Sequence, residues 1–297
     1  MVNAEVDHDP AKALEYKESG NKCFQAGDYT GAEALYSKAI THDPSNPLLY
    51  TNRSMALLKL QLYPRVILDT REAISLLPQN MKAYFQLAQA QIALSDSAAA
   101  LTSAKKAHEL CAEECINGGK GASSIGPITD LVLRAKKEDW ERREDERVRG
   151  MGGLLRDVVK GMEESRDREL EGIKGEGDEK EEKVSEVVWR WLKKIEEVRS
   201  VFEIAEANAG GAKDESRRRK VPDWCVDDIT FSVMLDPVVK TKTGQSYDRS
   251  SIMEHLRRSP TDPLTREPLQ VSDLRPNLAL KAACEEFLDE NGWAADW

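Results

Sequence analysis

The sequence predicts a mostly α-helical protein with three parts: a solenoid of helical repeats, a long helical hairpin and a small ββα module. Three observations support this prediction. Ala39, Ala73 and Ala107 recur at equal steps along the chain. Residues 127–207 combine dense charge with apolar positions at helical spacing, which is typical of long amphipathic helices. Residues 221–297 change to short β-type segments separated by turn residues.

Residues 11–115 are predicted to form three helix–turn–helix units. Each unit carries two apolar stripes at helical spacing, and the first pair is interrupted at Gly27 and Asp28. The step between the alanines is the period of the tetratricopeptide repeat, about 34 residues, whose units stack into a solenoid with a concave binding face. Small residues that let the two helices of a unit approach closely recur at the same step: Gly20, Ser54 and Ala88.

Composition excludes several classes of function. The net charge of −10 argues against a nucleic-acid-binding surface, which requires basic residues. No run of 18 apolar residues is present and the first residues lack the apolar core of a signal peptide, so we expect a location in the cytoplasm. The cysteines show no spacing typical of a disulfide framework, which favours a reducing compartment: Cys23, Cys111, Cys115, Cys225 and Cys284.

The middle of the chain is predicted to be an antiparallel helical hairpin. Charges of both signs at i,i+4 spacing stabilise its first helix, and two apolar stripes flank the polar segment 172–183. These stripes need a partner, which could be each other, the solenoid or a second copy of the chain. Residues 208–220 are predicted to be a linker; the Arg-Arg-Arg-Lys run at its end could address the nucleus, but a solvated linker is the simpler interpretation.

Four polar residues of the repeats do not suit packing. Lys17 and Asn21 lie on the first helix of unit one, Asn52 on that of unit two and Lys82 on that of unit three. First helices line the inner groove of such a solenoid. Two ammonium groups and two amides that converge there would form a receptor for carboxylates.

A single surface Lys or Asn would be ordinary, but together the four resemble the carboxylate-clamp tetratricopeptide domains. Such domains hold the C-terminal Glu-Glu-Val-Asp of cytosolic heat-shock chaperones, so the resemblance implies that these four residues are clamp residues. The pattern departs from the family at Gln86, where many clamps have a basic residue. Phe85, one residue earlier, could instead provide an apolar wall for the bound tail.

Residues 221–297 predict a β-hairpin, a helix capped by Asp248, a proline-rich loop and a final helix capped by Asn277. A ββα module with two long loops suggests a RING-like fold, which needs two zinc ions with four ligands each. The segment offers too few ligands for this (Cys225, His255 and Cys284), so we expect no metal and loops braced by polar side chains. Cys111 and Cys115 likewise lack a second pair nearby and are predicted to fill space in a core rather than to bind zinc.

A RING-like fold without zinc is the U-box, and the segment resembles that family closely. The family's motifs occur in order: Pro222-Asp-Trp-Cys, Ile229-Thr-Phe231, Met234-Leu-Asp-Pro237-Val, Gly244-Gln-Ser-Tyr247-Asp248-Arg249, Ile252, His255-Leu256, Asp262-Pro263-Leu264-Thr265-Arg266, Pro268-Leu269 and Pro276-Asn277. The resemblance implies that the two loops bind a ubiquitin-conjugating enzyme. The residues implied are Ile229 and Phe231 in the first loop and Pro263 and Leu264 in the second, with Arg266 bridging the enzyme and its ubiquitin.

Taken together, the three parts resemble the CHIP family of chaperone-associated ubiquitin ligases. The resemblance implies a ligase without a nucleophile of its own, which restrains a thioester-linked ubiquitin in a reactive pose. The implied partners are chaperone tails, a conjugating enzyme, ubiquitin, misfolded clients and, through the hairpin, a second copy of the chain. The alternative is a non-catalytic co-chaperone adaptor. A cofactor-dependent enzyme has no support, because the sequence contains no Gly-rich phosphate loop and no metal-ligand set.

Overall fold

The computed structural model describes residues 8–116, 124–174, 178–209 and 220–297. They form two compact units. The first comprises Met1–Trp140 together with Val221–Trp297, and the second comprises Glu141–Lys220. Helices dominate both, so the predicted fold class is confirmed.

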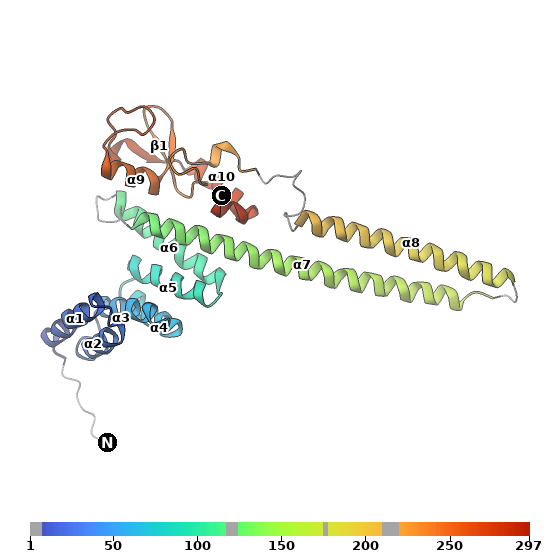
Figure 1. The fold of residues 1–297 in the computed structure, drawn as a ribbon, viewed down its shortest axis with the longest axis horizontal. Helices are drawn as coiled ribbons and strands as arrows, with labels where there is room; N and C mark the ends of the chain where they lie inside the picture. The colour runs from blue at the N-terminus through green and yellow to red at the C-terminus, as the bar shows by residue number, and fades with distance from the viewer. Residues whose placement is uncertain (1–7, 117–123, 175–177, 210–219) are drawn as a thin grey trace, which may run out of the picture. The chain divides into compact units, whose positions relative to one another are not determined.

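The repeat region consists of three antiparallel helix pairs stacked on one another (Figure 1). Its periodic alanines are all completely buried, and Gly20, Ser54 and Ala88 are buried as well. A methyl group on Gly20 would lie 2.7 Å from the ring of Tyr36, so only glycine permits this contact. The helices are α1 (Pro10–Gln25), α2 (Tyr29–His42), α3 (Pro47–Lys59), α4 (Tyr63–Leu76), α5 (Met81–Ala93) and α6 (Ser97–Ile116).

The turn inside each repeat uses the same backbone geometry. Gly27, Gln61 and Ser95, which recur at the same step as the alanines, have left-handed backbones with φ of 83°, 58° and 60°. In each turn the backbone N–H of this residue donates to the carbonyl of the residue three positions earlier. The N–H of the following residue donates to the carbonyl of the residue five positions before it. This is the Schellman ending of a helix, which satisfies the last carbonyls of the first helix of the pair.

Helix α7 (Ile125–Glu171) continues the solenoid before it leaves it. Ile128 packs into a buried cluster with Cys111 and Cys115, and Leu131 and Val132 pack into a second cluster with α5 and α6. The first compact unit therefore extends to Trp140, because an apolar face on the first turns of α7 covers the last repeat.

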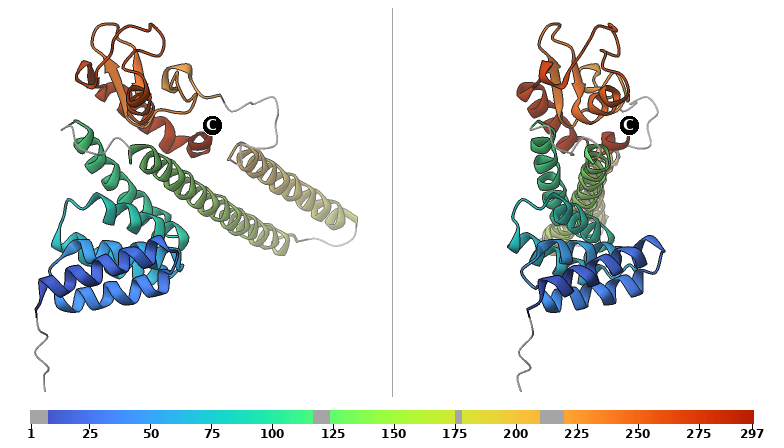
Figure 2. Two further views of the ribbon diagram at one scale, coloured as in Figure 1. Left: turned by 60° about the vertical axis from the view of Figure 1, so that its left-hand side comes forward. Right: turned by 90° about the vertical axis from the view of Figure 1, so that its left-hand side faces the viewer.

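The second unit contains the rest of α7 and helix α8 (Asp178–Ala209), which run side by side (Figures 1 and 2). Arg190 and the indole N–H of Trp191 both bind Glu169 across the pair. The two helices cover only part of their apolar stripes. Val159 and Ile195 are buried. Large apolar side chains that remain exposed are Leu154, Trp189, Leu192, Val201 and Ile204. None of the helices described has the length and apolar composition needed to cross a membrane.

The C-terminal module has a three-stranded antiparallel sheet of order β2-β1-β3. The predicted hairpin is present as β1 (Pro237–Lys240) and β2 (Ser246–Asp248), and Asp248 and Asn277 cap the two predicted helices. The third strand was not predicted, because three residues ending in proline show no β pattern. The remaining elements are η2 (Asp223–Cys225), α9 (Arg249–Arg258), η3 (Val271–Asp273), β3 (Leu274–Pro276), α10 (Leu278–Glu290) and η4 (Gly292–Asp296).

Candidate functional site

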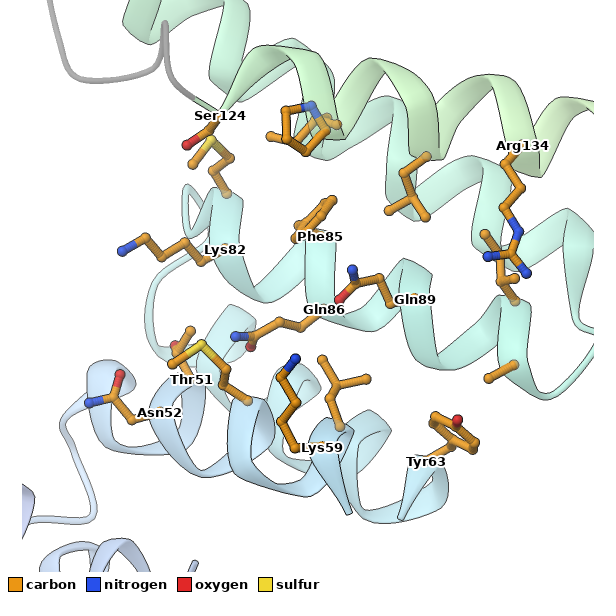
Figure 3. Close-up of a pocket in the computed structure, with 18 residues that line it drawn as sticks. Thr51, Asn52, Lys59, Tyr63, Lys82, Phe85, Gln86, Gln89, Ser124 and Arg134 are labelled. Carbon is orange, nitrogen blue, oxygen red and sulfur yellow. The ribbon is translucent and has the colours of Figure 1, made fainter. Parts of the chain in front are cut away.

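A groove of about 770 Å³ lies between α3, α5 and the first turns of α7 (Figure 3). Asn52 and Lys82 stand at one end of it, and Phe85 lies on its wall. Lys17 and Asn21 do not line the groove itself, but both lie on α1, and Asn21 is hydrogen-bonded to Asn52 on α3. The structure thus brings three of the five predicted residues of the repeat region into one cavity.

Asn21 connects to this end of the groove through hydrogen bonds. Its Oδ1 atom accepts from the Tyr36 hydroxyl (2.8 Å) and from Nδ2 of Asn52 (3.3 Å). Because the oxygen is occupied by two donors, the NH₂ group of Asn21 remains for an acceptor outside the protein. Asn52 spends one N–H of its amide on Asn21 and keeps the other for a ligand.

The two predicted clamp lysines have no acidic partner in the part of the chain that the structure describes. Neither Lys17 nor Lys82 lies within ion-pair distance of a carboxylate among the residues described. Lys82 is exposed and Lys17 is half-buried. An ammonium group without a partner beside amide donors attracts an anion, and a carboxylate of a peptide would supply it.

Phe85 and Gln86 have different roles in the groove. Phe85 is half-buried and packs against both clusters that join α7 to the last repeat. Gln86 is only 6% exposed, and its Oε1 accepts a hydrogen bond from the Ser54 hydroxyl. Gln86 thus pairs with Ser54, one of the small residues of the periodic series, and does not replace the missing basic group.

Several polar residues that line the groove were not predicted from the sequence. Lys59 and Gln89 line it seven residues after Asn52 and Lys82, which is two helical turns along the same faces. This spacing could have identified them. Arg134 reaches the groove from α7, and no repeat pattern pointed to a helix outside the repeats.

Two loops of the C-terminal module are built on one plan. Each begins with an aspartate whose backbone N–H donates to the carbonyl five residues later, at 2.9 Å in the first loop and 2.8 Å in the second. The aspartate side chain then accepts the N–H of the threonine three residues on, and an isolated β-bridge closes each loop at its base. The equivalent pairs are Asp227 and Asp262, Ile229 and Leu264, Thr230 and Thr265, and Phe231 and Arg266.

The last residue of each loop has a left-handed backbone. Phe231 has φ of 58° and Arg266 has φ of 60°, which is uncommon for residues other than glycine. The geometry persists because each backbone N–H donates to the carbonyl of its loop's aspartate, at 2.8 and 2.9 Å. Strained backbone of this kind tends to occur at functional positions, and both residues belong to the predicted site.

Adjacent residues of β2 hold the two loops at the same end of the module. The backbone N–H of Asp248 donates to Asp227 (2.8 Å), and the hydroxyl of Tyr247 donates to Asp262 (3.2 Å). In addition, Nε2 of His255 lies 2.8 Å from the carbonyl oxygen of Thr261 at the base of the second loop. Polar side chains therefore brace the loops, as predicted.

Lys240 is the centre of the bracing of the second loop. Its side chain is almost completely buried, and its Nζ lies 3.0 Å from carboxylate oxygens of both Asp262 and Glu267. The hydrogen bond with Glu267 is the main cause that raises the pKa of Lys240. Burial alone would raise the pKa of Asp262, but backbone hydrogen bonds from Thr265 and Leu264 and the ammonium of Lys240 outweigh it and lower the pKa to about 2. Among the residues described, no group of three His, Cys, Asp or Glu side chains could hold a metal ion.

This pKa shift predicts acid sensitivity of the second loop. The carboxyl of Asp262 has a pKa of about 2 in the folded protein and an ordinary value of 3.8, so its stabilisation is complete above about pH 5 and is lost as the pH falls towards 2. The difference corresponds to about 2 kcal/mol, or roughly 30-fold in protection of the loop amides from hydrogen exchange. Protection factors of residues 261–268, measured from pH 5 to pH 2, should fall by this amount. Asp262→Asn should flatten the profile and exposed Asp223→Asn should not; an equally steep profile in Asp262→Asn would contradict the assignment.

The loop tips expose apolar surface in the absence of a partner. Phe231 is 71% exposed and Leu264 is 56% exposed, whereas Pro263 is half-buried. Ile229, which the resemblance assigns to the enzyme-binding surface, is half-buried because it packs against the core cluster around Val238. Exposed apolar side chains on rigid loops are typical of protein-binding surfaces.

Comparison with protein families defines the class of the two sites. Residues 221–293 match the model of the U-box domain, and residues 20–61 match a model of the tetratricopeptide repeat. The chain thus combines a repeat solenoid that has a cationic groove with a U-box whose two loops are exposed.

Individual proteins extend this result. The E3 ubiquitin-protein ligase CHIP of Arabidopsis thaliana is 27% identical over 285 residues, which cover 96% of this chain and 96% of that protein. The ubiquitin conjugation factor E4 of Schizosaccharomyces pombe is 40% identical over 77 residues, 26% of this chain and 8% of that protein. Among solved structures, the first tetratricopeptide domain of Spaghetti (RPAP3), bound to the HSP90 peptide SRMEEVD, is 33% identical and covers 40% of this chain and 92% of its own, with a TM-score of 0.35. The resemblance to CHIP is confirmed over nearly the whole chain.

Proposed function

We infer that this chain is a ubiquitin-protein ligase of the U-box type that takes its substrates from chaperones. The U-box match and the similarity to CHIP along 96% of the chain support the ligase activity. The charge of the groove carries the chaperone part of the proposal. Lys59, Lys82 and Arg134 line it, and no acidic side chain does so among the residues described, although the chain as a whole has a net charge of −10. An acidic peptide is the occupant that such a groove favours.

We propose that the end of the groove marked by Asn52 and Lys82 binds the C-terminal Glu-Glu-Val-Asp of a cytosolic heat-shock chaperone. Lys17 and Lys82 would neutralise its carboxylates, while the amides of Asn21 and Asn52 donate to its terminal and backbone oxygens. Phe85 would pack against its apolar side chain. Residues 11–115, completed by the first turns of α7, form the chaperone-binding domain in this proposal.

At the other end of the chain, we propose that the U-box loops bind a ubiquitin-conjugating enzyme. Phe231 and Leu264 would supply most of the apolar contact, with Pro263 and Ile229 at its edge. Arg266 would donate hydrogen bonds both to the enzyme and to the ubiquitin on its cysteine. A lysine amine of the client then attacks the thioester carbonyl, so the isopeptide bond forms as the bond to sulfur breaks. Restraining the flexible thioester increases the fraction of time it spends in a reactive pose.

One experiment distinguishes the ligase from a non-catalytic co-chaperone adaptor. The full chain is incubated with ubiquitin-activating enzyme, ATP, ubiquitin and a panel of conjugating enzymes, and binding of a Glu-Glu-Val-Asp peptide is measured in parallel. Ubiquitin chains formed with at least one enzyme support the ligase. Peptide binding without ubiquitin transfer by any enzyme of the panel would favour the adaptor.

The five cysteines are all free, which suits a reducing compartment, and we propose the cytoplasm as the location of this protein.

We propose that the exposed apolar side chains of the helical hairpin are covered by a second copy of the chain in a homodimer. Trp189, Leu192, Val201 and Ile204 all lie on α8 and are more than half exposed, which is costly for a long helix without a partner. Light scattering of the full chain should therefore give twice the monomer mass. Val201→Lys should shift the mass towards the monomer, and the exposed Glu203→Lys should not. A monomer at micromolar concentration in the unmodified chain would contradict the proposal.

A further inference from the structure

The groove extends well beyond the end that would hold the terminal carboxylates. Along α5 it is lined from Lys82 to Ile92, ten residues or about 15 Å of helix. An extended peptide advances about 3.3 Å per residue, so four or five more residues of a tail fit between these two points. The groove can therefore read residues that precede the terminal motif.

The far end of the groove carries a cation from outside the repeats. Figure 3 shows Arg134 on α7 opposite the end marked by Asn52 and Lys82. Its side chain is 64% exposed, and its Nε atom lies 2.9 Å from a carboxylate oxygen of Glu138, one turn further along the same helix. Exposed pairs of this kind contribute only about 0.3–0.5 kcal/mol, so a ligand carboxylate can replace Glu138 at little cost.

The side chain of Arg134 takes no part in the buried contacts of α7. Its neighbours Leu131 and Ala135 are buried in the cluster that joins α7 to α5 and α6, whereas the arginine faces solvent. Replacement of Arg134 therefore leaves the apolar wall of the groove in place. Lys59, midway along the groove, keeps the passage cationic between the two ends.

We propose that Arg134 is a specificity-determining residue that favours tails with an acidic side chain about four or five residues before the one held at Lys82. This inference rests on the proposed binding of acidic chaperone tails. The partner class is an extended C-terminal peptide with two acidic groups, which are separated by the length of groove between Lys82 and Arg134. Tails with a basic residue at the position nearest Arg134 should bind more weakly, because the two positive charges repel each other.

Peptide binding tests the proposal directly. Fluorescent peptides share a C-terminal Glu-Glu-Val-Asp and a neutral spacer, and a single Glu, Ala or Lys is placed in turn at each position from four to nine residues before the C-terminus. Affinities for the full chain are measured by anisotropy at low and at physiological salt. We expect the Glu peptide to bind three- to tenfold more tightly than the Lys peptide at one or two adjacent positions, and this preference to shrink as salt is raised.

Variants identify the residue responsible. Relative to the affinity for the Ala peptide, Arg134→Ala should abolish the preference and Arg134→Glu should invert it. Arg142→Ala is the matched control, because Arg142 makes the same i,i+4 pair with Glu146 on α7 but does not line the groove. A preference that persists in Arg134→Ala, or an equal loss for all three peptides, would overturn the inference while leaving tail binding intact. If the unmodified chain binds none of the peptides, the proposed chaperone binding itself fails.

Discussion

Replacement of Lys17 by alanine is expected to weaken binding of a Glu-Glu-Val-Asp peptide by roughly ten- to a hundredfold and to leave autoubiquitination unchanged. The estimate follows from the loss of one charge-assisted hydrogen bond, about 1.5–3 kcal/mol. Lys17 is half-buried and has no acidic partner among the described residues, so its removal leaves no charge of the protein unpaired. The U-box loops do not depend on this residue, and the two functions should separate.

Anisotropy with the labelled peptide measures the first effect, and a ubiquitin-chain assay without chaperone measures the second. Lys22→Ala provides the matched control, because Lys22 is an exposed lysine of the same helix that lies one residue after Asn21 and so faces another direction. Equal losses in both lysine variants would indicate a general electrostatic effect and contradict a clamp. Loss of ubiquitin transfer in Lys17→Ala would mean that the two sites are coupled.

Arg266→Ala is expected to reduce discharge of ubiquitin from the conjugating enzyme at least tenfold, with peptide binding unchanged. Arg266 is exposed at the end of the second loop, on a left-handed backbone that the hydrogen bond to Asp262 maintains. Its side chain therefore projects from a rigid position without contributing to the core. Removal should affect the orientation of the thioester-linked ubiquitin and not the fold of the loop.

Single-turnover discharge of a preloaded enzyme onto free lysine isolates this step. Arg266→Lys tests whether charge suffices, and we expect only partial recovery because an ammonium group lacks the planar fork of donors. Arg275→Ala, on β3, is the control for loss of an exposed arginine from the same module. Full activity of Arg266→Ala with every productive enzyme would refute the assigned role.

Local and periodic features of this protein could be read from its sequence. A regular repeat places equivalent side chains in equivalent surroundings, so Ala39, Ala73 and Ala107 had to be buried together. Asn21 and Asn52 lie on successive first helices, which were expected to line one groove, and the two side chains are hydrogen-bonded. Helix caps such as Asp248 were predictable because they depend on residues two or three positions away.

Features that join distant parts of the chain required the tertiary structure. Arg134 enters the groove only because the apolar face of α7 continues the solenoid, and no period extends into that helix. The side-chain oxygen of Gln86 is held by Ser54 on another helix, and Ile229 is half-buried by core residues that follow it. The pattern of apolar residues determines which faces must be buried, but it does not state which partner covers each face. That choice depends on the packing of side chains and on hydrogen bonds between elements far apart in sequence, which only the folded chain specifies.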